Sequence, residues 1–190
     1  HVCFDQVQRA DAARAHGGHA APAGAGGKAG RWRLRRVDDE FRLLASFDNE
    51  DNGTPFGFDA DGTTLWVGSS RDNDLSRLVA IDVATGTETV LDEDEVADLG
   101  APIISDKDRK LLGAAYLRDR LVVHAFDDQF ADDMDAVRAI SDGDPRIMGS
   151  SADERIWTIA FDSDTEPGAT YLFNRDTGES EFLFRPRPWL

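Results

Sequence analysis

Short apolar runs return along this chain with a period of about 46 residues, and this period restricts the possible folds more than any other feature. The runs that contain Leu65, Leu111 and Ile156 lie 46 and 45 residues apart, and each follows a polar turn with an acidic residue. Farther along, the pairs Thr85–Gly86 and Thr177–Gly178 lie 92 residues apart, which is twice 46. Such regularity indicates one structural unit that is repeated.

The repeated unit is built of β-strands. From Phe41 onward, short runs rich in Val, Ile, Leu and aromatic residues are separated by Asp, Gly and Asn turns, which favours antiparallel strands. A period in the forties with about four strands is typical of propeller blades. A single blade has two apolar faces and buries both only when neighbouring blades stack on it. The predicted fold is therefore all-β, a β-propeller.

The predicted propeller is partial. Three four-stranded antiparallel blades are expected at about residues 55–98, 101–144 and 145–186. Residues 32–47 would supply outer strands of another blade. Because closed propellers have about four to eight blades, residues 31–190 are expected to be part of a larger assembly, with a longer protein favoured over an oligomeric ring.

The middle blade departs from the strand pattern. Phe130, Met134, Val137 and Ile140 follow one another at helical spacing, so they would share one helix face. Aspartates at the start of this segment and Arg138 near its end suit the helix dipole. A short helical insert is predicted here, between two strands of the blade.

Residues 1–30 are predicted to be a low-complexity, disordered leader. The stretch from Ala10 to Gly30 is rich in alanine, glycine and histidine and has no periodicity. Residues 1–36 hold seven basic and two acidic side chains, whereas the whole chain has a net charge of −16. His16 and His19 have a spacing that suits a metal, but the two glycines between them favour an unstructured segment over a metal site.

The strong acidity excludes several kinds of partner. A net charge of −16 argues against binding to nucleic acid or to anionic membranes, because both need basic patches. No apolar run reaches the length of a membrane span. The single cysteine, Cys3, cannot form an internal disulfide, so the cytoplasm is the default location.

No local motif predicts catalysis. The nearest match to a Gly-x-Ser-x-Gly nucleophile motif, at Gly149–Asp153, lacks the last glycine and falls on a repeated blade turn, so Ser151 is predicted to be a turn residue. His124 lies inside a strand and is predicted to pack against its neighbours. No catalytic, cofactor-binding or metal-binding residue is assigned, and no cofactor is expected.

Two further patterns favour a structural role over a metal-binding or catalytic role. Residues 48–59 resemble a calcium loop at Asp48, Glu50, Asn52, Gly53 and Asp59, but the twelfth position is Asp, and strands flank the segment. A polar linker between blades is the preferred interpretation, with an acidic calcium-binding β protein as an alternative. Structural positions are also expected for the carboxylate pairs Asp72/Asp74 and Asp92/Asp94, on the surface, and for Trp66 and Trp157, in the packing between blades.

The order of the motifs resembles one family. Residues 58–66 (Phe-Asp-Ala-Asp-Gly-Thr-Thr-Leu-Trp) resemble the blade motif of prolyl oligopeptidase and TolB-like propellers, with Ala60 in place of the usual proline. Residues 78–91 and 171–179 continue this order around the helical insert. The end of the chain, Phe182–Leu190, is similar to the stretch that precedes the α/β-hydrolase domain in dipeptidyl aminopeptidase and acylaminoacyl-peptidase-like members.

The resemblance implies the propeller of a serine peptidase. In this family the propeller gates and orients short peptides for a hydrolase domain with a Ser-Asp-His triad, which would follow Leu190. None of the catalytic residues has a match in the chain. The alternative is a stand-alone TolB-like or WD-like propeller that acts as a protein-binding scaffold.

Overall fold

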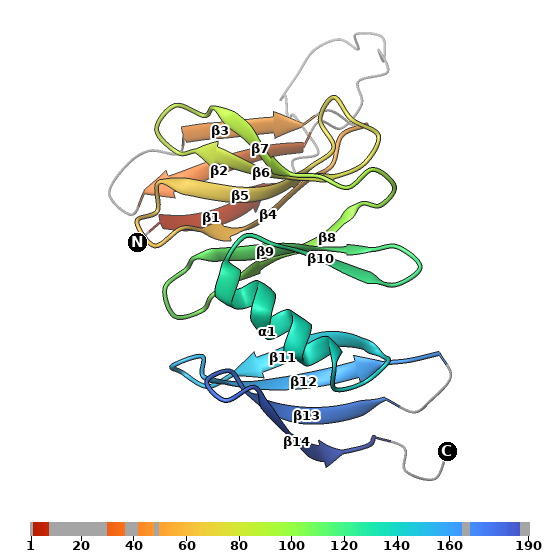
Figure 1. Cartoon of the computed structure of the whole chain (residues 1–190). Helices are drawn as coiled ribbons and strands as arrows, with labels where there is room; N and C mark the ends of the chain where they lie inside the picture. The colour runs from red at the N-terminus through yellow and green to blue at the C-terminus, as the bar shows by residue number, and fades with distance from the viewer. Residues whose placement is uncertain (1, 8–29, 37–41, 48–49, 165–167, 187–190) are drawn as a thin grey trace, which may run out of the picture. The chain divides into compact units, whose positions relative to one another are not determined.

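The structure is a computed structural model that describes residues 2–7, 30–36, 42–47, 50–164 and 168–186. The chain divides into two compact units, residues 1–95 and residues 96–190. The described strands form four sheets, each with its strands in chain order and each antiparallel (Figure 1). The chain is all-β apart from one short helix, and it has the fold of a partial β-propeller.

The N-terminal unit contains two sheets. One is three-stranded, with β1 (Val2–Val7), β2 (Gly30–Arg36) and β3 (Arg42–Phe47). The other is four-stranded, with β4 (Gly53–Phe58), β5 (Thr64–Ser69), β6 (Arg77–Asp82) and β7 (Glu88–Asp92). The four-stranded sheet coincides closely with the first predicted blade.

The first strand lies within the predicted leader. Residues Val2–Val7 pair with β2 along their whole length, with Phe4 opposite Leu34. The leader therefore does not include residues 2–7, whose apolar residues recur at short intervals and allow a strand. The low-complexity stretch that supported the prediction, together with His16 and His19, lies outside the described residues.

The second strand of the first four-stranded sheet, β5, is buried on both faces, as expected inside a blade. Leu65 and Val67 point to one face and pack with Leu44 and Phe47 of β3. Trp66, between them in sequence, points to the other face and is also buried. Successive strand residues point to opposite faces, so a continuous apolar run marks a strand with two covered faces.

Arg71 ties the two sheets of this unit together. Its guanidinium donates to Glu88 Oε2 at 2.6 Å and to the carbonyl of Ser46 at 2.7 Å. It also lies over the Phe47 ring, 4.5 Å from the ring centre, where a cation is attracted by the ring's electrons. Phe47 is thus held in one position beneath a charged side chain.

Gly53→Ala is expected to lower the free energy of unfolding by about 1–3 kcal/mol, the usual cost of overpacking. A Cβ at Gly53 would lie 2.4 Å from the Phe47 ring, which is buried and has little room to move. Urea denaturation measures the change. Gly149→Ala is the matched control, since a Cβ there meets nothing within 4 Å, and equal losses in both variants would contradict the prediction.

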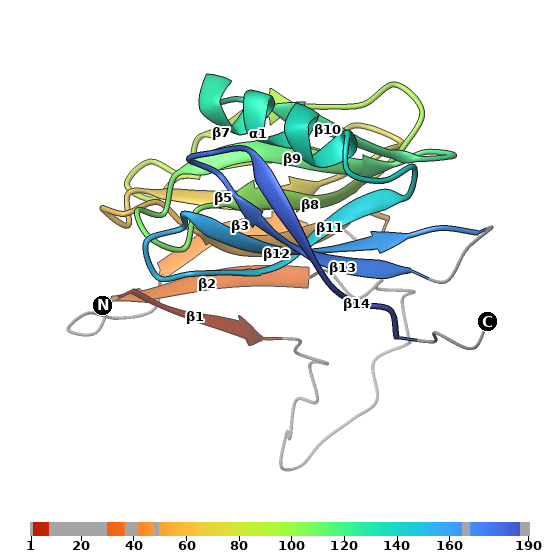
Figure 2. The same ribbon diagram turned by 60° about the horizontal axis from the view of Figure 1, so that its bottom comes forward.

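The C-terminal unit holds the remaining elements. The first sheet is three-stranded, with β8 (Leu99–Ile104), β9 (Leu111–Leu117) and β10 (Leu121–Ala125). Helix α1 (Asp128–Arg138) follows β10 and leads to a four-stranded sheet. That sheet consists of β11 (Asp144–Ser150), β12 (Ile156–Asp162), β13 (Ala169–Asn174) and β14 (Glu179–Phe184), with β11 and β14 at its two edges (Figure 2).

The helix takes the place of the fourth strand that was expected in the middle blade. It connects two different sheets and does not lie between two strands of one sheet. Phe130, Met134 and Val137 are buried against Trp157 and Phe173 of the next sheet. A segment with this helical spacing cannot present its apolar residues to one side of a strand, and so it folds as a helix.

Asp127 is the N-cap of the helix. Its Oδ1 accepts from the Phe130 N–H at 3.0 Å, and its Oδ2 accepts from Lys110. The hydrogen bond from Lys110 and, after it, the backbone hydrogen bond from Phe130 hold the pKa of Asp127 below its ordinary value. The aspartates predicted to favour the helix start therefore include its cap.

This pKa predicts a loss of stability in acid. Because the folded-state pKa is lowered, the cap stabilises the fold above about pH 4 and loses its effect as the pH falls through the folded-state value. Asp127→Asn keeps the cap acceptor but does not ionise. Thermal denaturation between about pH 6 and about pH 2.5 should show a smaller acid loss for this variant. Identical pH profiles for variant and wild type would contradict the prediction.

The repeat is also visible in backbone details. The second strands β5, β9 and β12 begin at or next to the anchors Leu65, Leu111 and Ile156. Phe56 and Met148, which are 92 residues apart, are each the extra residue of a β-bulge in the first strand of a sheet. Gly86 and Gly178 have φ angles of 75° and 70° in the equivalent downstream turns. The predicted turn glycines are confirmed.

Candidate functional site

A groove lies between the two sheets of the C-terminal unit. It has a volume of about 860 Å³, and β8 and β9 line one wall while β11 and β12 line the other. The apolar lining includes Leu112, Val123, Met134, Ile147 and Trp157. A groove of this size with a mainly apolar lining and a few polar groups is the usual form of a ligand site.

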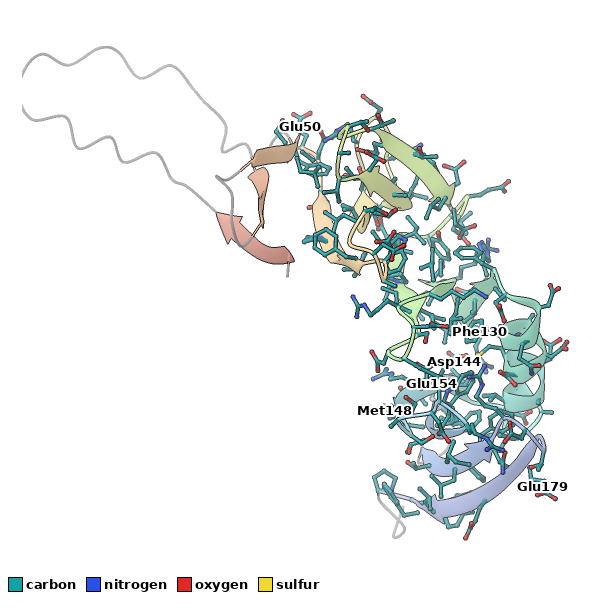
Figure 3. All side chains as sticks on the ribbon, turned by 90° about the vertical axis from the view of Figure 1, so that its left-hand side faces the viewer. Glu50, Phe130, Asp144, Met148, Glu154 and Glu179 are labelled. Carbon is teal, nitrogen blue, oxygen red and sulfur yellow. The ribbon has the colours of Figure 1, made fainter. Side chains whose placement is uncertain are left out.

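Two strand edges border the groove. Among the described strands, β8 and β11 pair on one side only, and both contribute residues to the lining. The bulge at Met148 interrupts the regular pairing of β11 with β12, and the Met148 side chain is 59% exposed. Figure 3 shows Met148 on the side of the unit away from α1. Backbone groups along such edges are available to another extended chain.

Glu154 clamps the two sheets together at one end of the groove. Its Oε2 accepts from Ser105 Oγ at 2.8 Å, and its Oε1 accepts from the N–H groups of Asp106 at 2.6 Å and Lys107 at 3.2 Å. Glu154 lies in the β11–β12 turn, and all three donors lie in the β8–β9 turn. The carboxylate thus joins two hairpin turns that are far apart in sequence.

The backbone at Glu154 shows how strongly this clamp is held. Its φ is 58°, in the left-handed region, which is unfavourable for a residue with a side chain. Gly62, in the corresponding turn of the N-terminal unit, has a φ of 70° and bears no such cost. The repeat position thus suits glycine, and the hydrogen bonds of the side chain offset the strain.

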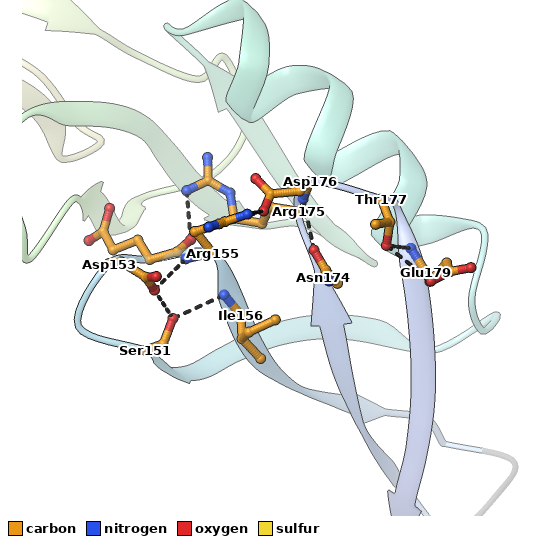
Figure 4. A network of polar contacts seen from close by, with 10 residues as sticks. Ser151, Asp153, Arg155, Ile156, Asn174, Arg175, Asp176, Thr177 and Glu179 are labelled. Atoms are coloured by element: carbon orange, nitrogen blue, oxygen red, sulfur yellow. Dashed lines mark hydrogen bonds and ion pairs between the residues drawn. The ribbon is translucent and has the colours of Figure 1, made fainter.

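Arg175 extends the clamp into the core. It donates to the Glu154 carbonyl at 3.0 Å and to Asp133 Oδ2 at 2.7 Å, and it lies 4.4 Å from the centre of the Trp157 ring. Asp133 is 3% exposed, and its other oxygen accepts from Gln129 at 3.1 Å. The buried charge is therefore paired and hydrogen-bonded, as a buried carboxylate requires. Figure 4 shows Arg175 beside the turn that carries Ser151, Asp153 and Arg155.

The other end of the groove carries two ion pairs. Arg120 Nε lies 2.7 Å from Asp144 Oδ1, and Arg146 lies 2.8 Å from Asp162 Oδ2. Within each pair the positive charge of the arginine balances the negative charge of the aspartate. At the clamped end, Asp106 and Glu154 leave an excess of negative charge in the lining.

Ser151 lies where the repeat predicted it, in the β11–β12 turn. Its hydroxyl donates to Asp153 Oδ1 at 2.6 Å and accepts from the Ile156 N–H at 3.1 Å. The hydrogen bond from Ser151 and then that from the Arg155 N–H lower the pKa of Asp153. The hydroxyl is thus part of the turn that starts β12.

The other singled-out residues have structural surroundings too. The ring of His124, in β10, packs at an angle of 42° against the ring of Tyr116 with centres 4.9 Å apart, which confirms that it packs against a strand neighbour. Trp66 and Trp157 are both buried, as predicted. Asp72 has a φ of 56° in the loop after β5, and Asp94 is buried where a surface position was expected.

In the calcium-like segment, Asp59 and Gly53 have structural surroundings. Asp48 lies outside the described residues. Both oxygens of Asp59 accept from the turn that follows, from the Thr63 N–H, the Thr63 hydroxyl and the Thr64 N–H. Gly53 serves close packing against Phe47. Within the described part of the chain, no three His, Cys, Asp or Glu side chains are grouped to hold a metal.

Sequence reasoning missed the clamp. Arg175 and Asp133 are 42 residues apart, and Ser105 and Glu154 are 49 apart, so no local pattern joins them. One signal was available. Asp133 falls between Phe130 and Val137 on the apolar face of the helix, where a charged residue needs a buried partner.

Comparison with known proteins identifies a relative among peptidases. No family model matches the chain. The chain is 32% identical over 139 residues to dipeptidyl aminopeptidase BIII of Pseudoxanthomonas mexicana, and the match covers 72% of this chain but 20% of that protein. The chain thus spans about one fifth of the length of this relative.

Solved structures show the same fold. A prolyl endopeptidase, studied for the role of inter-domain dynamics in catalysis, matches 82% of this chain and 23% of its own, with a TM-score of 0.56 and 19% identity. Prolyl oligopeptidase B from Galerina marginata, bound to a 25mer macrocyclization substrate, matches 84% and 23%, with a TM-score of 0.53 and 11% identity. Within the described residues, no helix has the length and apolar character to cross a membrane.

Proposed function

Because the chain is a β-propeller portion of the prolyl oligopeptidase family, we propose that it is the non-catalytic part of a serine peptidase. It would admit short peptides and orient them for a hydrolase domain that follows Leu190. The observation that carries the proposal is the 32% identity, over 139 residues, to a dipeptidyl aminopeptidase. The chain supplies selection of the substrate, and the hydrolase domain supplies the triad.

The groove supports selection by size. A volume of about 860 Å³ holds one extended peptide and excludes a folded domain. Extended peptides bind to strand edges through their main chain, so recognition of this kind accepts many sequences. The Glu154 clamp supports the role by holding the two walls of the groove together at one end.

The gene sequence beyond Leu190 tests the proposal first. We expect a Gly-x-Ser-x-Gly motif followed in order by Asp and His, which is the order of the triad in α/β-hydrolases. The full-length product should cleave dipeptidyl chromogenic substrates and short peptides but not folded proteins. A downstream frame without this motif, and a product without peptidase activity that binds a stable protein partner, would favour the scaffold alternative.

The isolated 190-residue chain is expected to show no turnover of aminoacyl or dipeptidyl chromogenic substrates. The Ser151 hydroxyl donates to Asp153 and accepts from the Ile156 N–H, so both of these hydrogen bonds stay within its own turn. The measurement is release of the chromophore with wild type and with Ser151→Ala. Hydrolysis by wild type that disappears in Ser151→Ala would show that Ser151 is a nucleophile.

A further inference from the structure

We propose that the groove of the C-terminal unit binds an extended peptide that pairs with the edge of β11. The apolar side chains of the peptide enter the groove, and a cationic group of the peptide lies beside Asp106 and Glu154. The inference rests on the proposed function in one respect, namely that the ligand is a peptide. It adds the place where the peptide binds and the chemistry that it must carry.

The strand edges carry the first step. Both β8 and β11 border the groove, and neither has a partner on its outer side among the described strands. Each strand contains one proline, but Pro102 lies in the middle of β8, whereas Pro145 is the second residue of β11 and leaves residues 146–150 with all their N–H groups. The edge of β11 is therefore the better template for an added strand.

Space and side-chain spacing carry the second step. Residues 148–150 of β11 line the groove and are all exposed, so the edge is open at this end of the strand. A peptide paired with β11 turns every second side chain toward the same face. Those side chains would meet the partly exposed apolar lining formed by Leu112, Val123 and Ile147. The peptide is thus expected to be apolar at alternate positions.

Charge carries the third step. The lining contains four acidic side chains, Asp106, Asp144, Glu154 and Asp162, and one basic side chain, Arg146. Asp144 and Asp162 have arginine partners, so the unbalanced charge lies at the clamped end. A lysine side chain on the peptide complements that end. A second copy of this chain, with a net charge of −16, and nucleic acid would both be repelled.

Binding of synthetic peptides to the whole 190-residue chain tests the inference. The probe is a fluorescein-labelled, acetylated Lys-Val-Thr-Val-Thr-Val peptide, and fluorescence anisotropy reports its Kd. A peptide with Glu in place of Lys, and one with N-methylated alternate amides, should each bind at least about tenfold more weakly. Equal binding of all three peptides would overturn the inference.

Variants locate the peptide. Ser150 pairs with Trp157, so their side chains share the groove face of the sheet. Ser150→Trp should weaken binding at least about tenfold, while Ser150→Ala should leave it unchanged. Phe184→Ser removes an exposed apolar residue from the opposite edge strand, β14, and should have no effect. Loss of binding in Phe184→Ser but not in Ser150→Trp would place the peptide on β14 and overturn the inference.

A charge reversal keeps the test independent of folding. Asp106 is exposed, so Asp106→Lys should leave the fold intact, as circular dichroism would verify. The substitution should weaken binding of the Lys peptide and strengthen binding of the Glu peptide by similar factors. No change in this preference would overturn the placement of the cationic group.

These measurements separate the inference from the proposed function. Peptide binding by the isolated chain that responds to Ser150→Trp supports the groove even if the full-length product is not a peptidase. Conversely, a full-length product that cleaves peptides, with the same KM in wild type and Ser150→Trp, would retain the proposed function and overturn the inference.

Discussion

Asp133→Ala is expected to lower the free energy of unfolding of the chain by about 3 kcal/mol. The substitution leaves Arg175 without its carboxylate while the guanidinium remains beneath the helix against Trp157. Removing one member of a buried ion pair costs far more than the pair contributes, because the other charge stays buried and unpaired. Urea denaturation followed by tryptophan fluorescence measures the change.

The same helix offers a matched control. Asp135 also pairs with an arginine, Arg138, at 3.2 Å, but its side chain is 80% exposed. Asp135→Ala should cost no more than about 0.5 kcal/mol, since solvent screens exposed pairs. In the double variant Asp133→Ala/Arg175→Ala, much of the loss should be recovered. Similar losses in the Asp133 and Asp135 variants would show that burial does not set the strength of the pair.

Phe130→Ala is expected to lower the free energy of unfolding by about 4 kcal/mol and to reduce the helical signal in circular dichroism. Phe130 is 0% exposed, and its ring meets the Trp157 ring edge-on with centres 6.0 Å apart. Its removal leaves a cavity between α1 and β12 and takes away the principal apolar contact of the first helical turn. An 11-residue helix does not persist in water without packing.

Phe126→Ala is the control for this second change. Phe126 precedes the helix cap and is 42% exposed, so its removal creates no closed cavity. We expect a loss below about 1 kcal/mol and an unchanged helical signal. Equal losses in the two variants would mean that α1 does not depend on its buried face.

The strands, their turns and their repeat were predictable from local patterns. The anchors Leu65, Leu111 and Ile156 stand at the starts of second strands because each follows a tight polar turn. The turn glycines have positive φ angles, which glycine adopts without steric cost because it has no Cβ. The helix was also predictable, since its apolar residues recur at helical spacing.

The place of the helix between two sheets was not predictable in the same way. A four-stranded middle blade followed from the repeat, but the chain has three strands there and then α1. The repeat describes an average unit, whereas the apolar face of α1 finds its partners in the following sheet, at Trp157 and Phe173. The residues Phe130 to Val137 and their partners Trp157 and Phe173 are 20 (157 − 137) to 43 (173 − 130) positions apart, which no local period records.

Local spacing therefore determined that the chain forms repeated antiparallel strands with one helix. It also determined that Ser151 occupies an ordinary turn position and His124 an ordinary strand position. Tertiary structure alone decided which charges are paired, where Glu154 clamps two turns, and where the groove opens. The reason is physical. Turns and strand faces depend on neighbours within a few residues, while burial and ion pairing depend on distant residues that only folding brings together.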